Sequence, residues 1–485
     1  MPKTVRDQDT STILPEEIRE RAKYCFECGI CTASCPMAEL LQSRYNPRTL
    51  LQKAFTDPGN ALKEDSLWLC AWCYKCHERC PQGLKPPEIF QLLKDEAVRQ
   101  EIVSGFRQAI SSMEKDVPLP AICWYMCFHP ERAGMNEEEL GDALRRIVSR
   151  RKTSKKKETA RDREEKVAVI GSGPAGLVVA SELSEKGYLV TVFEALPAPG
   201  GMLRKTIPEY RLPRTVLDAE IERLRSLGVE IRSNTRVGKD IDFGELWKAG
   251  FKAIFVGVGA HRNRMLGIQG ECLEGVVDAL EFLWKVNTQQ NAPLGRKVGV
   301  VGGGNVAVDV ARTALRQGAE EAVLLYRRTR EEMPANSWEV KEAEREGVKI
   351  EFLVAPTQVL EKDGKAAGLK CVKMKLGELD ETGRGKPVPI EGSDFLLQLD
   401  TIIVAIGEGV EADFLPEEVE VDKNHRVLVD PITMQTSVDG VFAGGDAVSG
   451  PATLIEAVLA GKRAACCIID YLENMRSKEA KHRGN

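Results

Sequence analysis

The sequence predicts a small helical, cysteine-rich domain followed by a larger α/β region with two parallel-sheet domains. Two observations lead to this fold class. Eight of the fourteen cysteines fall near the start, in two copies of one spacing pattern. Further along, two glycine-rich turns each stand between a short apolar strand and an apolar-periodic helix, which is the arrangement of a Rossmann-like unit.

Length and composition set the limits for this interpretation. The chain has 485 residues, which is roughly three domains. Its 43% hydrophobic and 29% charged residues are ordinary for a soluble globular protein, and a net charge of −5 gives no reason to expect nucleic acid. We find no run of about 18 apolar residues and no apolar core in residues 1–7, so we expect neither a membrane span nor a secretory signal. The expected location is a reducing cytoplasm, where cysteines bind metal or stay reduced.

The cysteine pattern is C-x2-C-x2-C-x3-C-P, first from Cys25 to Pro36 and again from Cys70 to Pro81. This is the bacterial ferredoxin spacing for two [4Fe–4S] clusters, in which the fourth cysteine of each copy ligates the other cluster. The predicted ligands of the first cluster are Cys25, Cys28, Cys31 and Cys80. Those of the second cluster are Cys70, Cys73, Cys76 and Cys35.

Three other interpretations of these cysteines are weaker. Structural zinc needs only four ligands and leaves the third cysteine and the Cys-Pro of each copy unexplained. Residues 73–77 match the C-x-x-C-H motif of c-type haem attachment, but they lie inside the ferredoxin pattern, and we take His77 as incidental. A disulfide scaffold conflicts with the expected compartment.

The segments around the cysteines favour helices. Residues 47–55 have apolar side chains at helical spacing, and a second helix is expected from Pro87, with proline near its start. Residues 25–36, 45–51 and 67–81 resemble the C subunit of heterodisulfide reductases. That resemblance implies a helical two-cluster ferredoxin domain over residues 1–110 and a role in electron relay.

Residues 111–165 are expected to form a helical adaptor and a linker. Cys123 and Cys127 are four residues apart, on one helix face. Residues 127–132 resemble the N-terminal domain of the glutamate synthase small subunit family, in which a cysteine soon follows the His-Pro. Here the His-Pro at 129–130 is followed by Glu-Arg, so we expect no third cluster. The basic run at 150–157 has no periodicity and favours an exposed linker.

The first glycine-rich turn follows a strand expected at 166–170. It contains Gly171, Gly173, Pro174, Ala175 and Gly176. A second strand at 189–193 ends at Glu194. The glycines allow a tight turn and the approach of a pyrophosphate to a helix N-terminus, and the acid can accept hydrogen bonds from the adenosine ribose.

The second turn follows a strand at 297–301. It contains Gly302, Gly303, Gly304, Asn305 and Val306. The next strand, at 322–326, ends in Arg327 and Arg328 instead of an acid, and Arg330 is a further candidate. Because an arginine can pair with a 2′-phosphate, this favours NADP over NAD. The alternative is a solvated basic strand end.

The α/β half as a whole resembles the small subunit of glutamate synthase, which shares the two-dinucleotide-binding-domain fold of glutathione reductase. The resemblance is carried by residues 200–203, 207–213, 326–335, 441–446 and 451–457. It implies FAD at the first turn and NADP(H) at the second. Further FAD contacts implied by the resemblance are Gly201, Met202, Leu203, Arg211, Gly259, Gly444, Gly445, Asp446, Ala452, Thr453 and Leu454. Gly407 is implied for NADP.

These assignments divide the α/β half into a split FAD domain and an insertion. We expect the FAD domain at 166–285 and 395–475, the NAD(P) domain at 286–394 and a charged tail at 476–485. One departure from the family stands out, because Lys205-Thr206 replaces a glycine usually found before Ile207-Pro208. Thr206 either alters the flavin environment or is a neutral loop change.

Together these features predict an electron-transfer enzyme that needs no acid–base or nucleophilic residue. A flavin can join two-electron nicotinamide chemistry to one-electron cluster chemistry, in either direction. Disulfide reduction is not expected, because no C-x-x-C or C-x4-C pair occurs after residue 165 and Cys466-Cys467 are expected in the core.

We expect the partners to be other iron–sulfur or flavin subunits of a complex, or ferredoxin. By family analogy such a complex could bifurcate electrons. The rival functions are a glutamate synthase small subunit, an electron donor to a heterodisulfide reductase-like complex, and a structural protein with vestigial sites.

Overall fold

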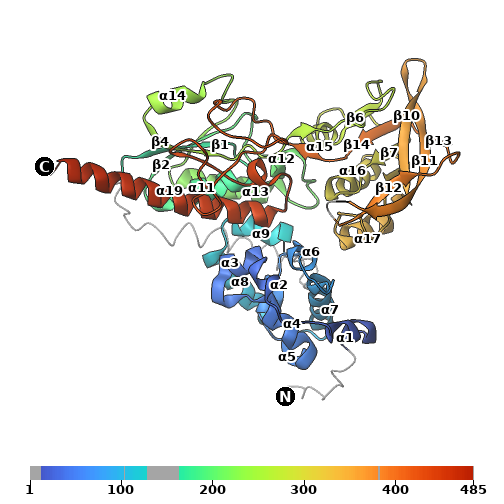
Figure 1. The fold of residues 1–485 in the computed structure, drawn as a ribbon, viewed down its shortest axis with the longest axis horizontal. Coiled ribbons are helices and arrows are strands. Elements are labelled where there is room, and N and C mark those ends of the chain that lie inside the picture. Colours follow the sequence, from blue (N-terminus) through green and yellow to red (C-terminus); the bar gives the residue numbers. More distant parts are fainter. Residues whose placement is uncertain (1–12, 103, 128–162, 381–382, 484–485) are drawn as a thin grey trace.

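The computed structural model describes residues 13–102, 104–127, 163–380 and 383–483. Figure 1 shows three parts: a helical part that carries the N-terminal region, and two α/β parts side by side. The long C-terminal helix runs along the boundary between the helical part and the first α/β part.

The helical part consists of short helices joined by the cysteine-bearing loops. The helices predicted at 47–55 and from Pro87 are confirmed as α4 and α7. Asn46 caps α4 by accepting hydrogen bonds from the amides of Arg48 and Thr49, and Pro47 occupies the first helical position. The helices are α1 (Glu16–Ala22), α2 (Ile30–Ala33), α3 (Pro36–Leu41), α4 (Pro47–Thr56), α5 (Pro58–Ala61), α6 (Lys75–Glu78), α7 (Pro86–Arg99), α8 (Ser104–Asp116) and α9 (Pro120–Cys127).

The first α/β part is built on a parallel five-stranded sheet of order β16-β4-β1-β2-β3. Its main strands are apolar and buried almost throughout, as expected for a parallel sheet covered on both faces. The strands are β1 (Lys166–Ile170), β2 (Leu189–Phe193), β3 (Glu230–Arg232), β4 (Phe251–Val256) and β16 (Val441–Ala443). The accompanying helices are α11 (Pro174–Glu185), α12 (Met202–Lys205), α13 (Arg214–Ser226), α14 (Phe243–Lys248), α18 (Asp446–Ser449) and α19 (Leu454–Arg483).

The second α/β part has its own parallel sheet, of order β6-β14-β7-β8-β9, and an antiparallel sheet beside it. The parallel strands are β6 (Val276–Asp278), β7 (Lys297–Val301), β8 (Glu321–Tyr326), β9 (Lys349–Phe352) and β14 (Thr401–Val404). Its helices are α15 (Ala279–Asn287), α16 (Asn305–Arg316) and α17 (Ser337–Arg345). The antiparallel strands are β10 (Val354–Lys362), β11 (Lys365–Leu379), β12 (Gly385–Pro389) and β13 (Phe395–Gln398). The chain passes between the parts at the pair β5 (Arg262–Asn263) and β15 (Glu408–Gly409).

The sheets differ from the expected domain boundaries at 285 and 395. β6 and β14 pair with each other and β14 pairs with β7, so both belong to the second sheet. β14, which lies within the expected second FAD segment 395–475, is therefore the last strand of the inserted domain, which extends from about β6 to β14. The expected separate tail at 476–485 also differs, because α19 continues without a break to Arg483.

The helical part shares one hydrophobic core with the first α/β part. Phe90 and Trp124 on one side belong to the same buried cluster as Leu217 and Ile468 on the other. α9 packs against both α13 and α19, and the buried carboxylate of Glu220 accepts a hydrogen bond from the Ala121 amide at 3.0 Å. This continuous core fixes the helical part against the sheet domain.

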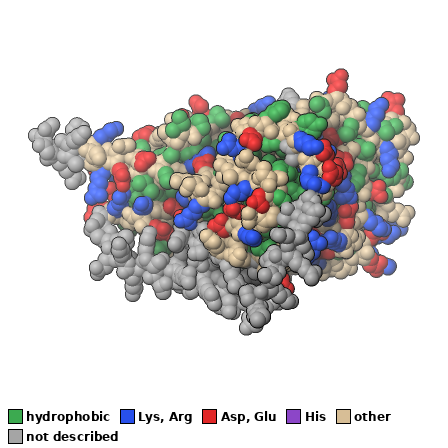
Figure 2. Space-filling model, turned by 90° about the horizontal axis from the view of Figure 1, so that it is seen from below, with side chains coloured by type: hydrophobic (Ala, Val, Ile, Leu, Met, Phe, Trp, Pro, Cys, Tyr) green, Lys and Arg blue, Asp and Glu red, His purple; other side chains and the backbone are tan. Residues whose placement is uncertain are grey.

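Two surface properties bear on the expected partners. Figure 2 shows acidic and basic side chains intermixed over the face seen from below, outside the grey residues. Within the described ranges, the model contains no helix with the length and apolarity needed to cross a bilayer.

Candidate functional site

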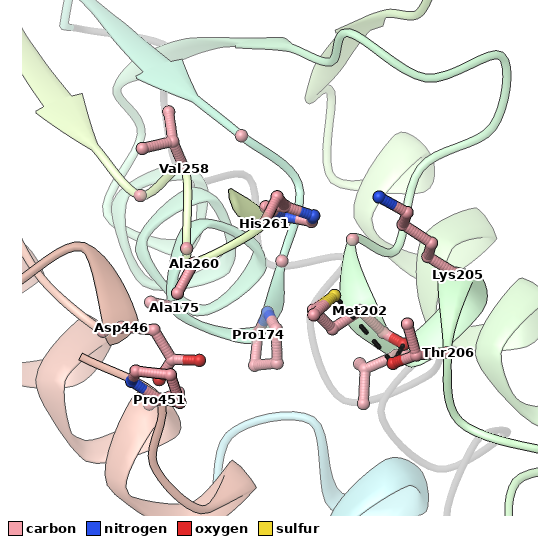
Figure 3. Close-up of a pocket in the computed structure, with 18 of the residues that line it drawn as sticks. Pro174, Ala175, Met202, Lys205, Thr206, Val258, Ala260, His261, Asp446 and Pro451 are labelled. Atoms are coloured by element: carbon pink, nitrogen blue, oxygen red, sulfur yellow. Dashed lines mark hydrogen bonds between the residues drawn. The ribbon is translucent and has the colours of Figure 1, made fainter. Parts of the chain in front are cut away.

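A cavity of about 690 Å³ lies where the three parts meet. It opens at the carboxyl ends of β1 and β4, where ligands of parallel α/β sheets bind. Figure 3 shows residues from distant segments around it, with Asp446 beside Ala175 on one side, Met202 and Thr206 on the other side, and Pro174 between them.

The first glycine-rich turn forms the floor of this cavity. A Cβ at Gly171 or Gly176 would overlap neighbouring backbone, so these two positions allow the tight turn and close helix–strand packing. A Cβ at Gly173 would meet nothing within 4 Å. The space above Gly173, at the N-terminus of α11, fits a pyrophosphate.

Glu194 stands at the end of β2, as the sequence predicts, and it is buried. One carboxylate oxygen accepts from the amide and hydroxyl of Ser172, and the other accepts from the Leu196 amide at 2.7 Å. These bonds hold the carboxylate at the cavity wall with acceptor capacity left for a ribose hydroxyl.

Asp446 provides an orphaned polar atom inside the cavity. Its Oδ1 is buried and has no hydrogen-bond partner among the described residues. Burial raises the pKa of this carboxyl to about 7, opposed by the Ala452 amide and reinforced by the charges of Glu456 and Glu408. An acceptor held in this way suits a ligand hydroxyl.

The N-terminus of α19 also opens on the cavity, through Ala452, Thr453 and Leu454. Glu456 closes its first turn by accepting from the amide and hydroxyl of Thr453, at 3.0 and 2.7 Å. The free amides and positive end of this long helix can stabilise negative charge on a bound ring system.

Lys205 and Thr206, the departure from the family pattern, both line the cavity. Thr206 is buried and donates to the Met202 carbonyl at 3.1 Å. His261 lies nearby, and burial together with the Lys205 and Arg236 cations lowers its pKa to about 4. No sequence motif indicated His261, because its position depends on the loop after β4.

Arg211 has a further role that the sequence did not indicate. It does line the cavity, but its guanidinium pairs with Asp309 of α16 at 2.6 Å and with Glu339 of α17 at 3.3 Å. Arg211 therefore joins the two α/β parts across a buried contact. Burial raises the pKa of Asp309 to about 6, although the Arg211 cation opposes this.

The second glycine-rich turn faces the same cavity from the other domain, through Asn305 and Val306. Gly302 and Gly303 have no room for a Cβ, whereas a Cβ at Gly304 would meet nothing within 4 Å. Gly304 is thus the counterpart of Gly173, with open space beside its Cα at the N-terminus of α16.

The three candidate arginines after β8 differ in what they contact. Arg328 is buried and bonds the Gly385 carbonyl at 2.9 Å and Asp380 at 2.6 Å, so it supports the fold and is not available to a phosphate. Arg330 pairs with Glu344. Arg327 is exposed and has no ion-pair partner in the described part of the chain, which leaves it as the candidate for a 2′-phosphate.

The cysteines gather into two sets. We call the first the outer site, because Cys28 is exposed; one small pocket is lined by Cys25, Cys28, Cys31 and Cys80. We call the second the inner site, because Cys70 and Cys76 are buried; these thiols interact electrostatically with Cys35, and so does Cys73. The members of the two groups are the cysteines predicted for the two clusters, and their role as cluster ligands stays a prediction.

The inner site adjoins the main cavity. Ala71, Trp72 and Cys73 line the cavity, as do Met126 and Cys127 of α9. Nothing in the sequence indicated this shared wall, since it depends on how the helical part docks against α19. Cys127 therefore lies at the cavity wall and Cys123 is buried, while the expected His129 and basic linker lie outside the described residues.

Two cysteine interpretations can now be compared with the structure. Among described residues, no group of three or more His, Cys, Asp or Glu side chains is gathered as for a single metal ion. Each thiolate of a [4Fe–4S] cube binds a different iron, so its ligands need a wider spacing than those of a mononuclear ion. His77, which the haem motif would use as an iron ligand, bonds the Leu84 carbonyl at 3.0 Å.

The expectation that Cys466 packs in the core is wrong, since it is exposed.

Comparison with known proteins agrees with a cysteine-rich helical part followed by an α/β half. Residues 165–461 match the pyridine nucleotide-disulphide oxidoreductase family, and residues 21–84 match the 4Fe-4S dicluster domain. Among solved structures, Mycobacterium tuberculosis FprA in complex with NADPH has a TM-score of 0.56 at 19% identity, over 65% of this chain and 86% of that one. T. acidophilum thioredoxin reductase has a TM-score of 0.51 at 19% identity, over 64% of this chain and 100% of that one.

Curated relatives extend the match beyond the α/β half. The NADP(+)-dependent formate dehydrogenase subunit beta of Moorella thermoacetica is 40% identical over 82% of this chain and 60% of its own length. The NADPH-Fe(3+) oxidoreductase subunit beta of Geobacter sulfurreducens is 37% identical over 82% of this chain and 63% of its length. The glutamate synthase [NADPH] small chain of Escherichia coli is 36% identical over 64% and 69%.

The chain spans about 60% of the length of the first two of these relatives. Its two matched regions nevertheless identify a pyridine nucleotide-linked oxidoreductase region preceded by a 4Fe–4S dicluster domain. The chain belongs to the pyridine nucleotide-disulphide oxidoreductase family.

Proposed function

We propose that this chain is an electron-transfer subunit that moves electrons between NADP(H) and a partner protein through a flavin site and two [4Fe–4S] sites. The proposed FAD contacts are those that line the main cavity, above all Gly173, Glu194 and Asp446. The proposed NADP contacts are the second glycine-rich turn and Arg327. The proposed cluster ligands are the inner and outer thiols.

The observation that carries this proposal is the order of the sites. The inner site shares Cys73 with the wall of the main cavity. The outer site follows, since α2, which carries Cys31, packs against α6, which carries Cys76. The outer site then reaches the surface at Cys28. Cavity, inner site, outer site and surface thus form one series.

FAD, when bound, takes up a hydride equivalent and can release its electrons singly. The chain's own residues prepare the site for it. Asp446 offers a buried acceptor, Glu194 is held rigid by three hydrogen bonds, and α19 presents its positive end.

The surface at the outer site supports a protein partner. In the described helical part, residues 13–127, the exposed large hydrophobic side chains are Tyr24, Phe26 and Ile30, which are 64%, 71% and 39% exposed. All three lie within the loop that carries the outer thiols. An apolar surface around an exposed cluster ligand suits a partner that brings its own iron–sulfur or flavin centre close.

The relatives suggest which kind of complex this is. The two beta subunits match over a longer part of this chain than the glutamate synthase small chain does, which favours a subunit that passes electrons to another redox subunit or to ferredoxin. A glutamate synthase small subunit remains the second candidate, on the similarity of the α/β half. A donor to a heterodisulfide reductase-like complex is the third.

Anaerobic purification of the full chain tests the proposal. We expect one FAD and about eight iron atoms per chain, and NADPH-dependent reduction of both clusters. Protein without flavin, or with far fewer irons in an anaerobic preparation, would overturn it. Identification of the subunits that co-purify from the native cell then separates the three kinds of complex.

A further inference from the structure

The two residues between Cys73 and Cys76 of the inner site reach two different domains. The Tyr74 hydroxyl lies 3.3 Å from the Ser337 hydroxyl at the start of α17, in the second α/β part. The Lys75 ammonium lies 3.3 Å from the Glu456 carboxylate in the first turn of α19. The loop that carries the inner thiols therefore touches both dinucleotide-binding domains.

Glu456 occupies the space between the inner site and the main cavity. One of its oxygens is held by Thr453, whose backbone lines the cavity, and the other faces Lys75. Its charge acts on the Cys73 thiol on one side and on the Asp446 carboxyl on the other. Without a counter-charge, this carboxylate would oppose the arrival of negative charge at either place.

Lys75 supplies that counter-charge. It also contacts Glu78 at 3.0 Å, within its own short helix. The Lys75 and Glu456 side chains are only 28% and 25% exposed, so solvent screens their charges less than those of a surface pair. A cation at this place stabilises an added electron at the inner site through space.

We propose that Lys75, through its ion pair with Glu456, is a positioning residue that sets the equilibrium of electrons between the flavin pocket and the inner cluster. This inference rests on the proposed function. The Lys75 cation favours reduction of the inner cluster, and the Glu456 carboxylate disfavours it. Neither residue touches the reacting atoms.

A merely structural role would look different, and the chain offers a matched control. Arg463 of α19 pairs with Glu39 of α3, so it also ties the helical part to the same helix. That pair is more exposed, at 49% and 43%, and neither residue is among the charges acting on Cys73 or Asp446. Loss of Arg463 removes an interdomain contact without changing the charge between the two sites.

The experiment is an anaerobic redox titration of the holoprotein, followed by flavin absorbance and by the EPR signals of the two clusters. The variants are Lys75→Met, Lys75→Arg, Glu456→Gln and Arg463→Met. For Lys75→Met we expect an about tenfold shift of the equilibrium away from the reduced inner cluster, which is about 59 mV for one electron. Glu456→Gln keeps an acceptor for Thr453 and should shift the equilibrium the other way. Lys75→Arg and Arg463→Met should remain close to the parent protein.

Opposite signs for the two charge changes distinguish an electrostatic role from a structural one. The inference is overturned if Lys75→Met, with full FAD and iron, leaves the inner potential unchanged. It is also overturned if Glu456→Gln shifts the potential in the same direction as Lys75→Met, or if Arg463→Met shifts it equally. If Lys75→Met loses iron, Glu456→Gln alone still decides the sign. Failure of the proposed function would appear instead in the parent protein, as missing FAD or iron.

Discussion

The inner and outer thiol sites have the same cysteine spacing but very different surroundings. The outer loop lies between the short helices α1 and α2, with Cys28 exposed beside Phe26. The inner loop follows the buried 3-10 turn Ser66–Leu69 and packs against the sheet domain, with Cys70 and Cys76 buried. Burial raises the pKa of Cys35 to about 12, and it raises the pKa of Cys76 further still.

This difference shows that a tandem motif predicts ligands but not direction. Two identical spacings could carry electrons either way between equivalent sites. The inner site is internal because its cysteine motif packs against the main cavity. The outer site is external because its motif is exposed at the surface. The following predictions test this difference in burial between the inner and outer sites, from the largest expected effect to the smallest.

Loss of an inner ligand should be far more damaging to internal transfer than loss of an outer one. In Cys73→Ala, NADPH should still reduce the flavin, but reduction of the outer cluster should fall at least about 100-fold, because its neighbour in the series is missing. In Cys28→Ala, the inner cluster should still be reduced at close to the parent rate. Stopped-flow absorbance with iron analysis measures both. Equal loss in the two variants would remove the distinction between the sites.

The same contrast of exposed and buried groups separates the arginines after β8. Arg327→Gln should lower kcat/KM for NADPH by about 10- to 100-fold with little change for NADH, as expected when one charged hydrogen bond is lost. Arg328→Gln should instead lower the thermal stability, because it leaves Asp380 without this partner. Steady-state kinetics with NADPH and NADH, together with melting curves of both variants, measure these two effects. A lower kcat/KM in Arg328→Gln together with a lower melting temperature in Arg327→Gln would contradict the prediction.

Alkylation tests the difference in exposure and ionisation between the outer and inner thiols. In metal-free protein, Cys28 should react with iodoacetamide at least about ten times faster than Cys76, because it is exposed and the buried thiol resists ionisation. Mass spectrometry of quenched time points identifies the modified residues. Similar rates at both positions would mean that the inner site is open to solvent.

The main cavity contains the buried carboxyl of Asp446, and its titration changes the stability of the fold in a defined direction. Because burial raises the pKa of Asp446 to about 7, the folded flavin-free protein retains a proton that the unfolded chain releases above about pH 4. The Asp446 contribution to stability therefore falls as the pH rises from about 4 to 7. Melting temperatures of the parent and Asp446→Asn across this range measure it. Parallel curves would contradict the assignment.

The smallest effect is expected at the exposed surface of the outer site. Phe26→Ser should slow electron transfer to a ferredoxin about two- to fivefold, by weakening apolar contact with the partner. Transfer to methyl viologen, which needs no docking surface, should be unchanged. A variant that slows both acceptors alike would point to damage at the outer cluster.

Much of the fold and site follows from local sequence signals. The glycines with no room for a Cβ and Glu194 at the end of β2 depend on spacing within one supersecondary unit, and the sequence shows that spacing directly. The helices α4 and α7 also carry their own start signals, in Asn46 and in prolines at the first turn.

The features that sequence reasoning missed depend on contacts between distant segments. Arg211 was expected at the flavin and does line the cavity, but its ion pairs with Asp309 of α16 and Glu339 of α17 in the other α/β part were not expected. The edge strand β6 joins a sheet whose other strands come later. The shared wall at Cys73 requires the helical part to be docked. No local pattern encodes these contacts.

The order of the two cluster sites is the central claim, and freeze-quench EPR tests it most directly. The anaerobic holoprotein is mixed with NADPH, and the two cluster signals are assigned from Cys28→Ser and Cys73→Ser proteins. The account predicts that the inner signal develops first and the outer signal follows. An outer signal that develops before the inner one would contradict it.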